Sequence, residues 1–186
     1  MSEKTDEKIA KEVQGGNSQS FGVLVERYEE KLRRYAKRFL LGYEDVEDLI
    51  QDVFLKAYTK IQSFDTDRSF NAWIYRIAHN EFINAIKKKG KEPLPFFDPD
   101  TLFPHPLSKE RPDHDLNDAE TKSMLDEFLG QIDAKYREPL VLYYYEDMDY
   151  AGLAEIMRIP KSTVGVRIHR GKAQLQKIFK ESKHSK

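Results

Sequence analysis

The residues best suited to chemistry lie in the stretch Phe64 to Lys89, FDTDRSFNAWIYRIAHNEFINAIKKK. A polar loop between two phenylalanines leads into an aromatic segment that contains the only tryptophan, Trp73, and ends in three lysines. Aromatic rings stack on unpaired bases and lysines attract phosphates, so this combination is typical of proteins that bind single-stranded nucleic acid. An ordinary amphipathic core helix with a solvated basic end would show the same pattern.

A second group consists of carboxylates, which can hold Mg²⁺ for phosphodiester chemistry. Its members are Glu44, Asp45, Glu47, Asp48 and Asp52. Metal ligands must converge on one ion, whereas a single helix distributes these side chains around more than one face. The pattern favours acids at a helix N-terminus, where the macrodipole stabilises them, on a face that is a docking surface or simply solvated.

Other signs of catalysis are weak. Gly165 to Lys172 superficially resembles a phosphate loop, but its spacing is one residue too long and no strand precedes it. The chain has no cysteine, and its five histidines are scattered. This composition excludes disulfides, thiolate zinc sites and cysteine nucleophiles. We therefore expect a protein that is not an enzyme and needs no metal or cofactor.

Composition indicates a soluble protein of the cytoplasm. Of 186 residues, 39% are hydrophobic and 34% are charged, which suits small helical domains with thin cores. No apolar run has the length of a membrane span, and the charged N-terminus does not resemble a secretory signal. The net charge is −1, yet residues 157–186 hold nine basic residues against one acid, Glu181. A basic C-terminal segment is common in nucleic-acid-binding proteins, although basic helix ends are also ordinary surface.

The spacing of apolar residues predicts an all-α fold of two small helical domains. In residues 1–90 we expect a short helix capped by Thr5 or Asp6, a long helix capped by Ser18 or Ser20 and ended by Gly42, and two further helices over about 44–61 and 70–89. Apolar residues recur every three or four positions in each of the last three, which predicts one bundle. The expected inward residues include Val46, Leu49, Ile50, Val53, Phe54, Tyr58 and Ile61 in the third helix, and Phe70, Trp73, Ile74, Ile77, Ala78 and Phe82 in the fourth.

Residues 91–117 hold six of the eight prolines. Because proline disfavours helices, this acidic segment is predicted to be an extended linker. Helical periodicity returns in residues 118–186. There a short helix over about 150–157, a turn through Arg158 to Pro160 and a basic helix from Lys161 form a helix-turn-helix pattern.

Three motifs in this order, EDVEDLIQDVFLKAY, FNAWIYRIAHN and IPKSTVGVRIHRGK, resemble the bacterial extracytoplasmic-function (ECF, group 4) sigma factors of the sigma-70 family. The resemblance covers about Phe21 to Phe179. It implies a dissociable RNA polymerase subunit that binds the core enzyme at its clamp and flap, melts promoter DNA at the minus-ten element and reads the minus-thirty-five element. It also implies an anti-sigma partner and a linker threaded through the polymerase cleft.

The resemblance assigns residues to three surfaces. The surface that binds core polymerase comprises Asp45, Asp48, Leu49, Gln51, Asp52, Phe54 and Lys56. The minus-ten surface comprises Phe64, Asp65, Arg68, Phe70, Asn80, Asn84, Lys87 and Lys88. The minus-thirty-five surface comprises Lys161, Ser162, Thr163, Arg167, Arg170 and Lys172, of which Ser162 and Thr163 also suit helix capping.

Two residues depart from the family pattern, which often has glycine at Arg158 and a lysine or arginine at Gly165. The DNA-reading role of the helix-turn-helix is therefore expected to be the same as in the family, but the family's base preference is not expected to apply. The main alternative is a helix-turn-helix regulator that binds duplex DNA without polymerase, with the first domain as a sensor or dimer module. A metal-dependent nuclease is a second alternative, which rests on the acidic helix alone.

Overall fold

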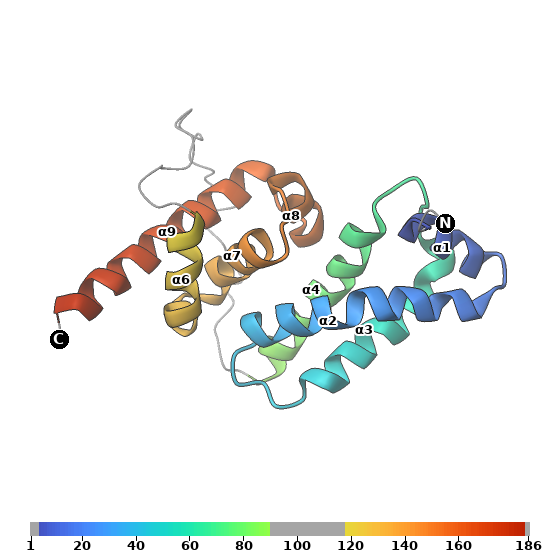
Figure 1. The fold of residues 1–186 in the computed structure, drawn as a ribbon, viewed down its shortest axis with the longest axis horizontal. Helices are drawn as coiled ribbons and strands as arrows, with labels where there is room; N and C mark the ends of the chain where they lie inside the picture. Colours follow the sequence, from blue (N-terminus) through green and yellow to red (C-terminus); the bar gives the residue numbers. More distant parts are fainter. Residues whose placement is uncertain (1–3, 90–117, 185–186) are drawn as a thin grey trace. The chain divides into compact units, whose positions relative to one another are not determined.

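The computed structural model of the protein describes residues 4–89 and 118–184, and within these ranges every regular element is a helix (Figure 1). The predicted all-α class is thereby confirmed. The chain divides into two compact units, Met1–Lys91 and Glu92–Lys186, called unit 1 and unit 2 below. The linker predicted over residues 91–117 lies outside the described residues. None of the described helices is both long and apolar enough to cross a membrane.

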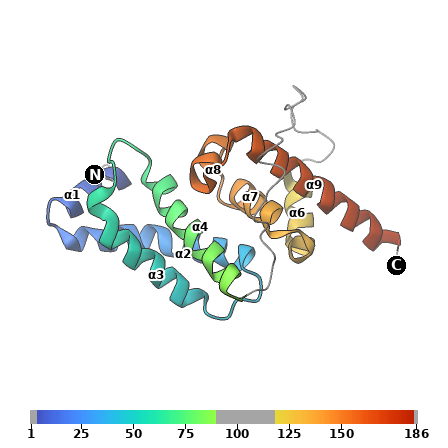
Figure 2. The same cartoon turned by 180° about the vertical axis from the view of Figure 1, so that it is seen from behind.

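Unit 1 is a bundle of four helices: α1 (Asp6–Gln14), α2 (Phe21–Phe39), α3 (Val46–Lys60) and α4 (Phe70–Lys89). α3 contacts both α2 and α4, while α1 contacts α2 and α4 at one end of the bundle (Figures 1 and 2). The apolar stripes predicted from the sequence meet in this core. Its largest fully buried side chains are Leu24, Leu32, Tyr35, Phe39, Phe70, Ile74, Tyr75 and Phe82.

Of the two predictions for helix N-caps, the one for α1 is confirmed and the one for α2 is wrong. Thr5 caps α1, since its hydroxyl accepts a hydrogen bond from the Lys8 amide at 3.4 Å. No serine side chain caps α2, which follows a 3-10 turn, Ser18–Ser20. The Ser20 hydroxyl instead donates to the Glu12 carboxylate at 3.0 Å and so ties this turn to α1. The capping role predicted for Ser18 or Ser20 was wrong, and for Ser20 the reason is that its hydroxyl bonds to Glu12 instead.

Tyr58 was also predicted wrongly. It has the helical spacing of a core residue, yet it is 43% exposed at the C-terminal end of α3. Its ring rests edge-on against Phe21 of α2 with 5.1 Å between centroids. The apolar stripe of α3 is therefore wider than the part of the helix that α2 and α4 cover. Leu55, 63% exposed, extends the same uncovered surface.

Unit 2 consists of α6 (Asp118–Phe128), α7 (Ala134–Tyr145), α8 (Tyr150–Met157) and α9 (Lys161–His184). The long α9 contacts each of the other three helices. Gly171 permits its close approach to α7, because a β-carbon there would lie 2.7 Å from Leu140 Cδ1. The predicted helix-turn-helix is present as α8, a short turn and α9.

The turn between α8 and α9 is fixed by two local features. At the start of α8, the Asp149 carboxylate accepts a hydrogen bond from the Gly152 amide at 2.7 Å. At its end, Arg158 adopts a left-handed conformation with φ of 53°. That conformation ends α8 and lets Pro160 precede α9, whose Val164 amide donates to the Pro160 carbonyl at 3.1 Å. Because glycine adopts positive φ most readily, Arg158 carries backbone strain.

Candidate nucleic-acid and protein interfaces

The polar loop that precedes α4 presents charged side chains to solvent. Asp65 and Arg68 are exposed, and the Asp65 carbonyl accepts a hydrogen bond from the Arg68 amide at 3.0 Å. The Asp65 carboxylate also accepts one from the Asp67 amide at 3.0 Å, which makes a local turn. The loop is thus a defined turn with an acid and a base on its outer side.

The two phenylalanines that frame this loop do not face solvent, contrary to the expectation that they would touch DNA. Phe64 is 5% exposed and Phe70 is fully buried. Their rings meet edge to face with 5.4 Å between centroids, and both contact Trp73, at 5.0 and 5.5 Å. The Phe64 and Phe70 rings pack against each other and against Trp73, so they leave no open surface on which a base could stack. The cluster instead supports the loop from the core side.

Beyond the loop, α4 carries an exposed polar and basic stripe. Asn80 and Asn84 are one helical turn apart and both are exposed, as are Lys87 and Lys88 one turn further on. Trp73, Ile74 and Ile77 point into the core, as predicted. The helix therefore combines a buried aromatic face with an outer face of amides and cations, groups that hydrogen-bond base edges and attract phosphates.

The residues expected to bind polymerase separate into exposed and packed groups. Asp45, Asp48, Gln51 and Asp52 are exposed around the first half of α3, and Leu49 is half-buried. Phe54 is only 9% exposed. Lys56 forms an ion pair with Glu81 and so holds α3 to α4. The sequence could not distinguish these groups, because ion pairs across helices depend on tertiary contacts.

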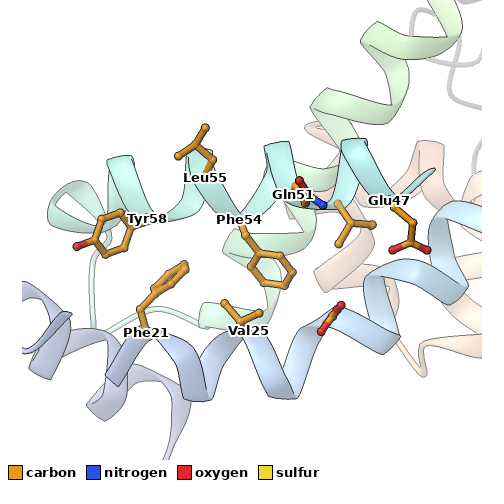
Figure 3. Close-up of a pocket in the computed structure, with 9 residues that line it drawn as sticks. Phe21, Val25, Glu47, Gln51, Phe54, Leu55 and Tyr58 are labelled. Carbon is orange, nitrogen blue, oxygen red and sulfur yellow. The ribbon is translucent and has the colours of Figure 1, made fainter. Parts of the chain in front are cut away.

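An apolar groove of about 390 Å³ lies between α2 and α3 beside these acids. Figure 3 shows Phe54 and Tyr58 of α3 pointing toward Phe21 and Val25 of α2, whereas Leu55 points away from α2. The other residues of its lining are Glu29, Glu47, Ile50 and Gln51. Gln51 and Phe54 of this lining were predicted to bind core polymerase, whereas Leu55 and Tyr58 were not among the predicted contacts. Their only signal in the sequence is an apolar stripe on α3 that is wider than one buried face.

Arg33 organises the acidic end of the groove. Its guanidinium pairs with Glu29 at 2.7 Å and with Glu30 on α2, and with Glu47 of α3 at 2.9 Å. The hydrogen bond from Arg33 lowers the pKa of Glu47, and the hydrogen bonds to Glu47 and Glu29 raise the pKa of Arg33. Glu47 is therefore engaged within the unit, while Asp48 and Asp52 point their charge outward.

The helix-turn-helix of unit 2 carries the third group. Lys161 is exposed at the start of α9, and Ser162, Arg167, Arg170 and Lys172 are half-buried along it. Thr163, which was expected among the contacts, is fully buried, because it lies on the face of α9 that packs into the unit. Gly165 is buried as well. The position at which the family often has a lysine or arginine therefore lies on an inner face of α9 in this chain.

The acidic side chains of the described residues form no cluster suited to a metal ion. No group of three or more His, Asp or Glu side chains within residues 4–89 and 118–184 is arranged to hold a metal ion. The acids at the start of α3 spread around the helix, and Glu47 is engaged by Arg33. This arrangement gives the nuclease hypothesis no site among the described residues.

Comparisons with known proteins point to one family. Residues 24–92 match the family description Sigma-70 region 2, and residues 122–175 match Sigma-70, region 4. The chain is 31% identical over 182 residues to the ECF RNA polymerase sigma factor SigW of Bacillus subtilis strain 168, which covers 94% of this chain and 96% of the relative.

Two solved structures share the fold over most of the chain. One is CnrH in complex with the cytosolic domain of CnrY, with a TM-score of 0.69, 25% identity and coverage of 95% of this chain and 97% of that one. The other is the sigma factor RpoE in complex with the anti-sigma factor NepR from Bartonella quintana, with a TM-score of 0.62, 26% identity and coverage of 87% and 98%.

Proposed function

Because the chain belongs to the ECF sigma factors of RNA polymerase, we propose that its exposed surfaces divide the tasks of polymerase binding, strand capture and duplex recognition. The protein is a sigma factor, a subunit that binds RNA polymerase and directs it to promoters. The observation that supports this function most strongly is the 31% identity to SigW over nearly the whole of both chains. The protein would act in the cytoplasm as an initiation subunit with no catalytic activity of its own.

Strand capture at the minus-ten element is assigned to the loop before α4 and to the outer face of α4. Asp65, Arg68 and Asn80 would hydrogen-bond a base pulled from the duplex, as a flipped base requires polar partners for its edge. Asn84 would extend this contact, while Lys87 and Lys88 would bind phosphates. Phe64 and Phe70 contribute through the buried cluster beneath the loop.

Recognition of the minus-thirty-five element is assigned to α9, whose N-terminal part would enter the major groove. Lys161, Ser162, Arg167, Arg170 and Lys172 supply donors for base edges and phosphates. The buried Thr163 would stabilise the helix without touching DNA. No base preference follows from these residues.

Core polymerase is assigned to the exposed side chains of α3 and its N-cap, Asp45, Asp48, Gln51 and Asp52, together with the groove that Gln51, Leu55 and Tyr58 line. Unit 2 would contact the flap, as the family resemblance implies. An anti-sigma partner that covers these surfaces is also proposed, because both solved relatives were captured with a partner, CnrY in one and the anti-sigma factor NepR in the other.

In-vitro transcription tests the proposed function. Purified protein and core polymerase, incubated with a pool of genomic promoter fragments, should form heparin-resistant open complexes on a subset of them. Core enzyme alone serves as the control. If no fragment yields an open complex while the protein still binds duplex DNA, the alternative of a polymerase-independent helix-turn-helix regulator would replace this proposal.

A pair of substitutions separates the two assignments within unit 1. Asn80→Ala should slow promoter melting, measured by permanganate reactivity of unpaired thymines, and leave the affinity for core polymerase unchanged. Asp52→Asn should lower the affinity for core polymerase and leave promoter melting unchanged once the polymerase is saturated, because Asp52 lies on α3 away from the loop. Loss of core affinity in the Asn80 variant would show that α4 belongs to the polymerase interface.

A further inference from the structure

Helix α1 holds the start of the strand-capturing loop. The Gln14 amide Nε2 donates hydrogen bonds to the carbonyl oxygens of Ile61 at 2.7 Å and Phe64 at 2.8 Å. Gln62, in the 3-10 turn between them, donates back to the Gln14 carbonyl at 3.3 Å. These bonds join residues 47 to 50 positions apart, and they fix the main chain where the loop begins.

The same helix also holds the end of the loop, through a carboxylate in its own first turn. Glu7 Oε1 accepts a hydrogen bond from the Phe70 amide at 3.1 Å, at the first residue of α4. Next to it, the Ser69 hydroxyl accepts one from the Ala72 amide at 3.2 Å. A carboxylate at a helix N-terminus satisfies an amide that has no partner within the helix and interacts favourably with the macrodipole.

A third contact links α1 to the aromatic cluster under the loop. The Tyr28 hydroxyl donates to the Asp6 carboxylate at 2.6 Å, and the Tyr28 ring rests edge-on against Phe70 at 5.5 Å. Burial, together with the hydrogen bond to Asp6, raises the pKa of Tyr28. Arg27 pairs with the same carboxylate at 2.5 Å. The loop is therefore restrained at its start, at its end and from below, each time through a residue of α1.

We propose that α1 is a positioning element for strand capture and that Glu7 and Gln14 are its positioning residues. By holding both ends of the loop in the free protein, they keep Asp65 and Arg68 in the arrangement that receives an unpaired base. A loop that is already ordered in the free protein loses little conformational entropy when it binds. Restraint of the loop therefore increases its affinity for the unpaired strand. This inference rests on the proposed role of the loop in capturing a strand.

The test uses the full chain and the non-template strand of a promoter selected with core polymerase, as a single-stranded oligonucleotide. An abasic site is placed at each position of the minus-ten element in turn. With the wild-type protein, we expect one position at which base removal weakens binding most, and this position marks the captured base. If no position does so, strand capture by this protein is absent, and the inference is overturned together with that part of the proposed function.

Gln14→Met keeps the length of the side chain and removes both donors. We expect it to weaken binding of the intact oligonucleotide by about tenfold. It should also reduce the further loss caused by the abasic site at the marked position, because a misplaced loop no longer uses that base. Gln19→Met is the matched control, since Gln19 is exposed in the turn before α2. It should behave like the wild type.

A structural role alone would give a different result. If Gln14→Met lowers affinity equally for the intact and every abasic oligonucleotide, with no coupling to the marked position, α1 serves general stability and the proposal is wrong. Core polymerase affinity, measured for each variant, should stay within twofold of wild type.

The other end of the loop supplies a second variant in case Gln14→Met fails to fold. Glu7→Leu removes the acceptor of the Phe70 amide, whereas Glu7→Gln retains an oxygen at the same place. We expect Glu7→Leu to accelerate hydrogen exchange of the Phe70 amide and to lose base discrimination, and Glu7→Gln to restore both. Equal behaviour of the two variants would contradict the positioning role.

Discussion

At the scale of single residues, Arg158 shows how the chain tolerates strain at a functional turn. Its φ of 53° places a non-glycine residue in the left-handed region, which costs about 1–2 kcal/mol. Arg158→Gly should therefore stabilise unit 2 by about 0.5–1 kcal/mol, because glycine loses more chain entropy on folding and so recovers only part of the strain. Thermal unfolding followed by circular dichroism would measure the change.

Arg158→Ala provides the matched comparison for this prediction. It removes the guanidinium but keeps the β-carbon, so it should leave stability nearly unchanged. Any loss of duplex affinity common to both variants would then report a DNA contact of the arginine, separate from the backbone. A destabilised Arg158→Gly variant would mean that the arginine side chain outweighs the backbone strain.

The residue scale is also where prediction from sequence was weakest. Residue type suggested DNA contacts for Phe64 and Thr163, and both are buried. Helical periodicity predicted a buried Tyr58, and it is 43% exposed. Each outcome depends on which neighbouring helix covers a given face, and one sequence does not contain that information. The exposure of Asp65, Arg68, Asn80 and Asn84 was predicted better, because polar groups avoid burial without a partner.

At the scale of elements, the ion pair between Arg33 and Glu47 links α2 to α3 at the surface of unit 1. Arg33→Ala and Glu47→Ala should each lower the melting temperature of unit 1, and the double variant should lose less than the sum of the two. High salt should shrink the coupling, because the pair lies at the surface.

Acid should also remove this coupling between α2 and α3. The pKa of Glu47 in the folded chain is lowered from 4.5 by Arg33, so its contribution is present above that pH and is lost as the pH falls through the lowered value. Unfolding curves of the wild type, both single variants and the double variant at neutral and acid pH would measure it. A coupling that survives at acid pH would contradict this account.

Element boundaries themselves followed from the sequence to within a few residues. The stripes of α2 and α4 and the break before Lys161 are local signals, since helix periodicity and turn residues act over a few positions. Capping of α2 was not predictable in the same way. Ser20 bonds to Glu12, a partner whose position depends on how α1 folds back on the turn.

At the scale of the whole molecule, the two units are expected to unfold separately, because each has its own core. Trp73, the only tryptophan, is buried in unit 1 and so reports on that unit alone. Leu153→Ala truncates a fully buried side chain of unit 2 and should destabilise that unit by about 3 kcal/mol. Circular dichroism should then show that unit 2 unfolds at a lower temperature, while the unfolding temperature of unit 1, followed by tryptophan fluorescence, stays the same.

A matched truncation in unit 1 completes this experiment. Leu32→Ala, at another fully buried leucine, should shift the fluorescence transition and leave the remaining circular dichroism transition unchanged. If Leu153→Ala moved the tryptophan transition as well, the units would form one cooperative body. The order of the two domains was predictable from composition and motifs, whereas the independence of their folding requires this measurement.

The place of α1 relative to the family match has a practical consequence. The match to Sigma-70 region 2 starts at residue 24, so the segment that contains Glu7 and Gln14 precedes it. A fragment trimmed to the recognisable region would keep every assigned DNA contact of unit 1 and lose the bonds that hold their loop. Base selectivity measured with such a fragment would be lower than that of the intact protein. Engineered chimaeras that exchange region 2 between sigma factors should therefore include the helix that precedes it.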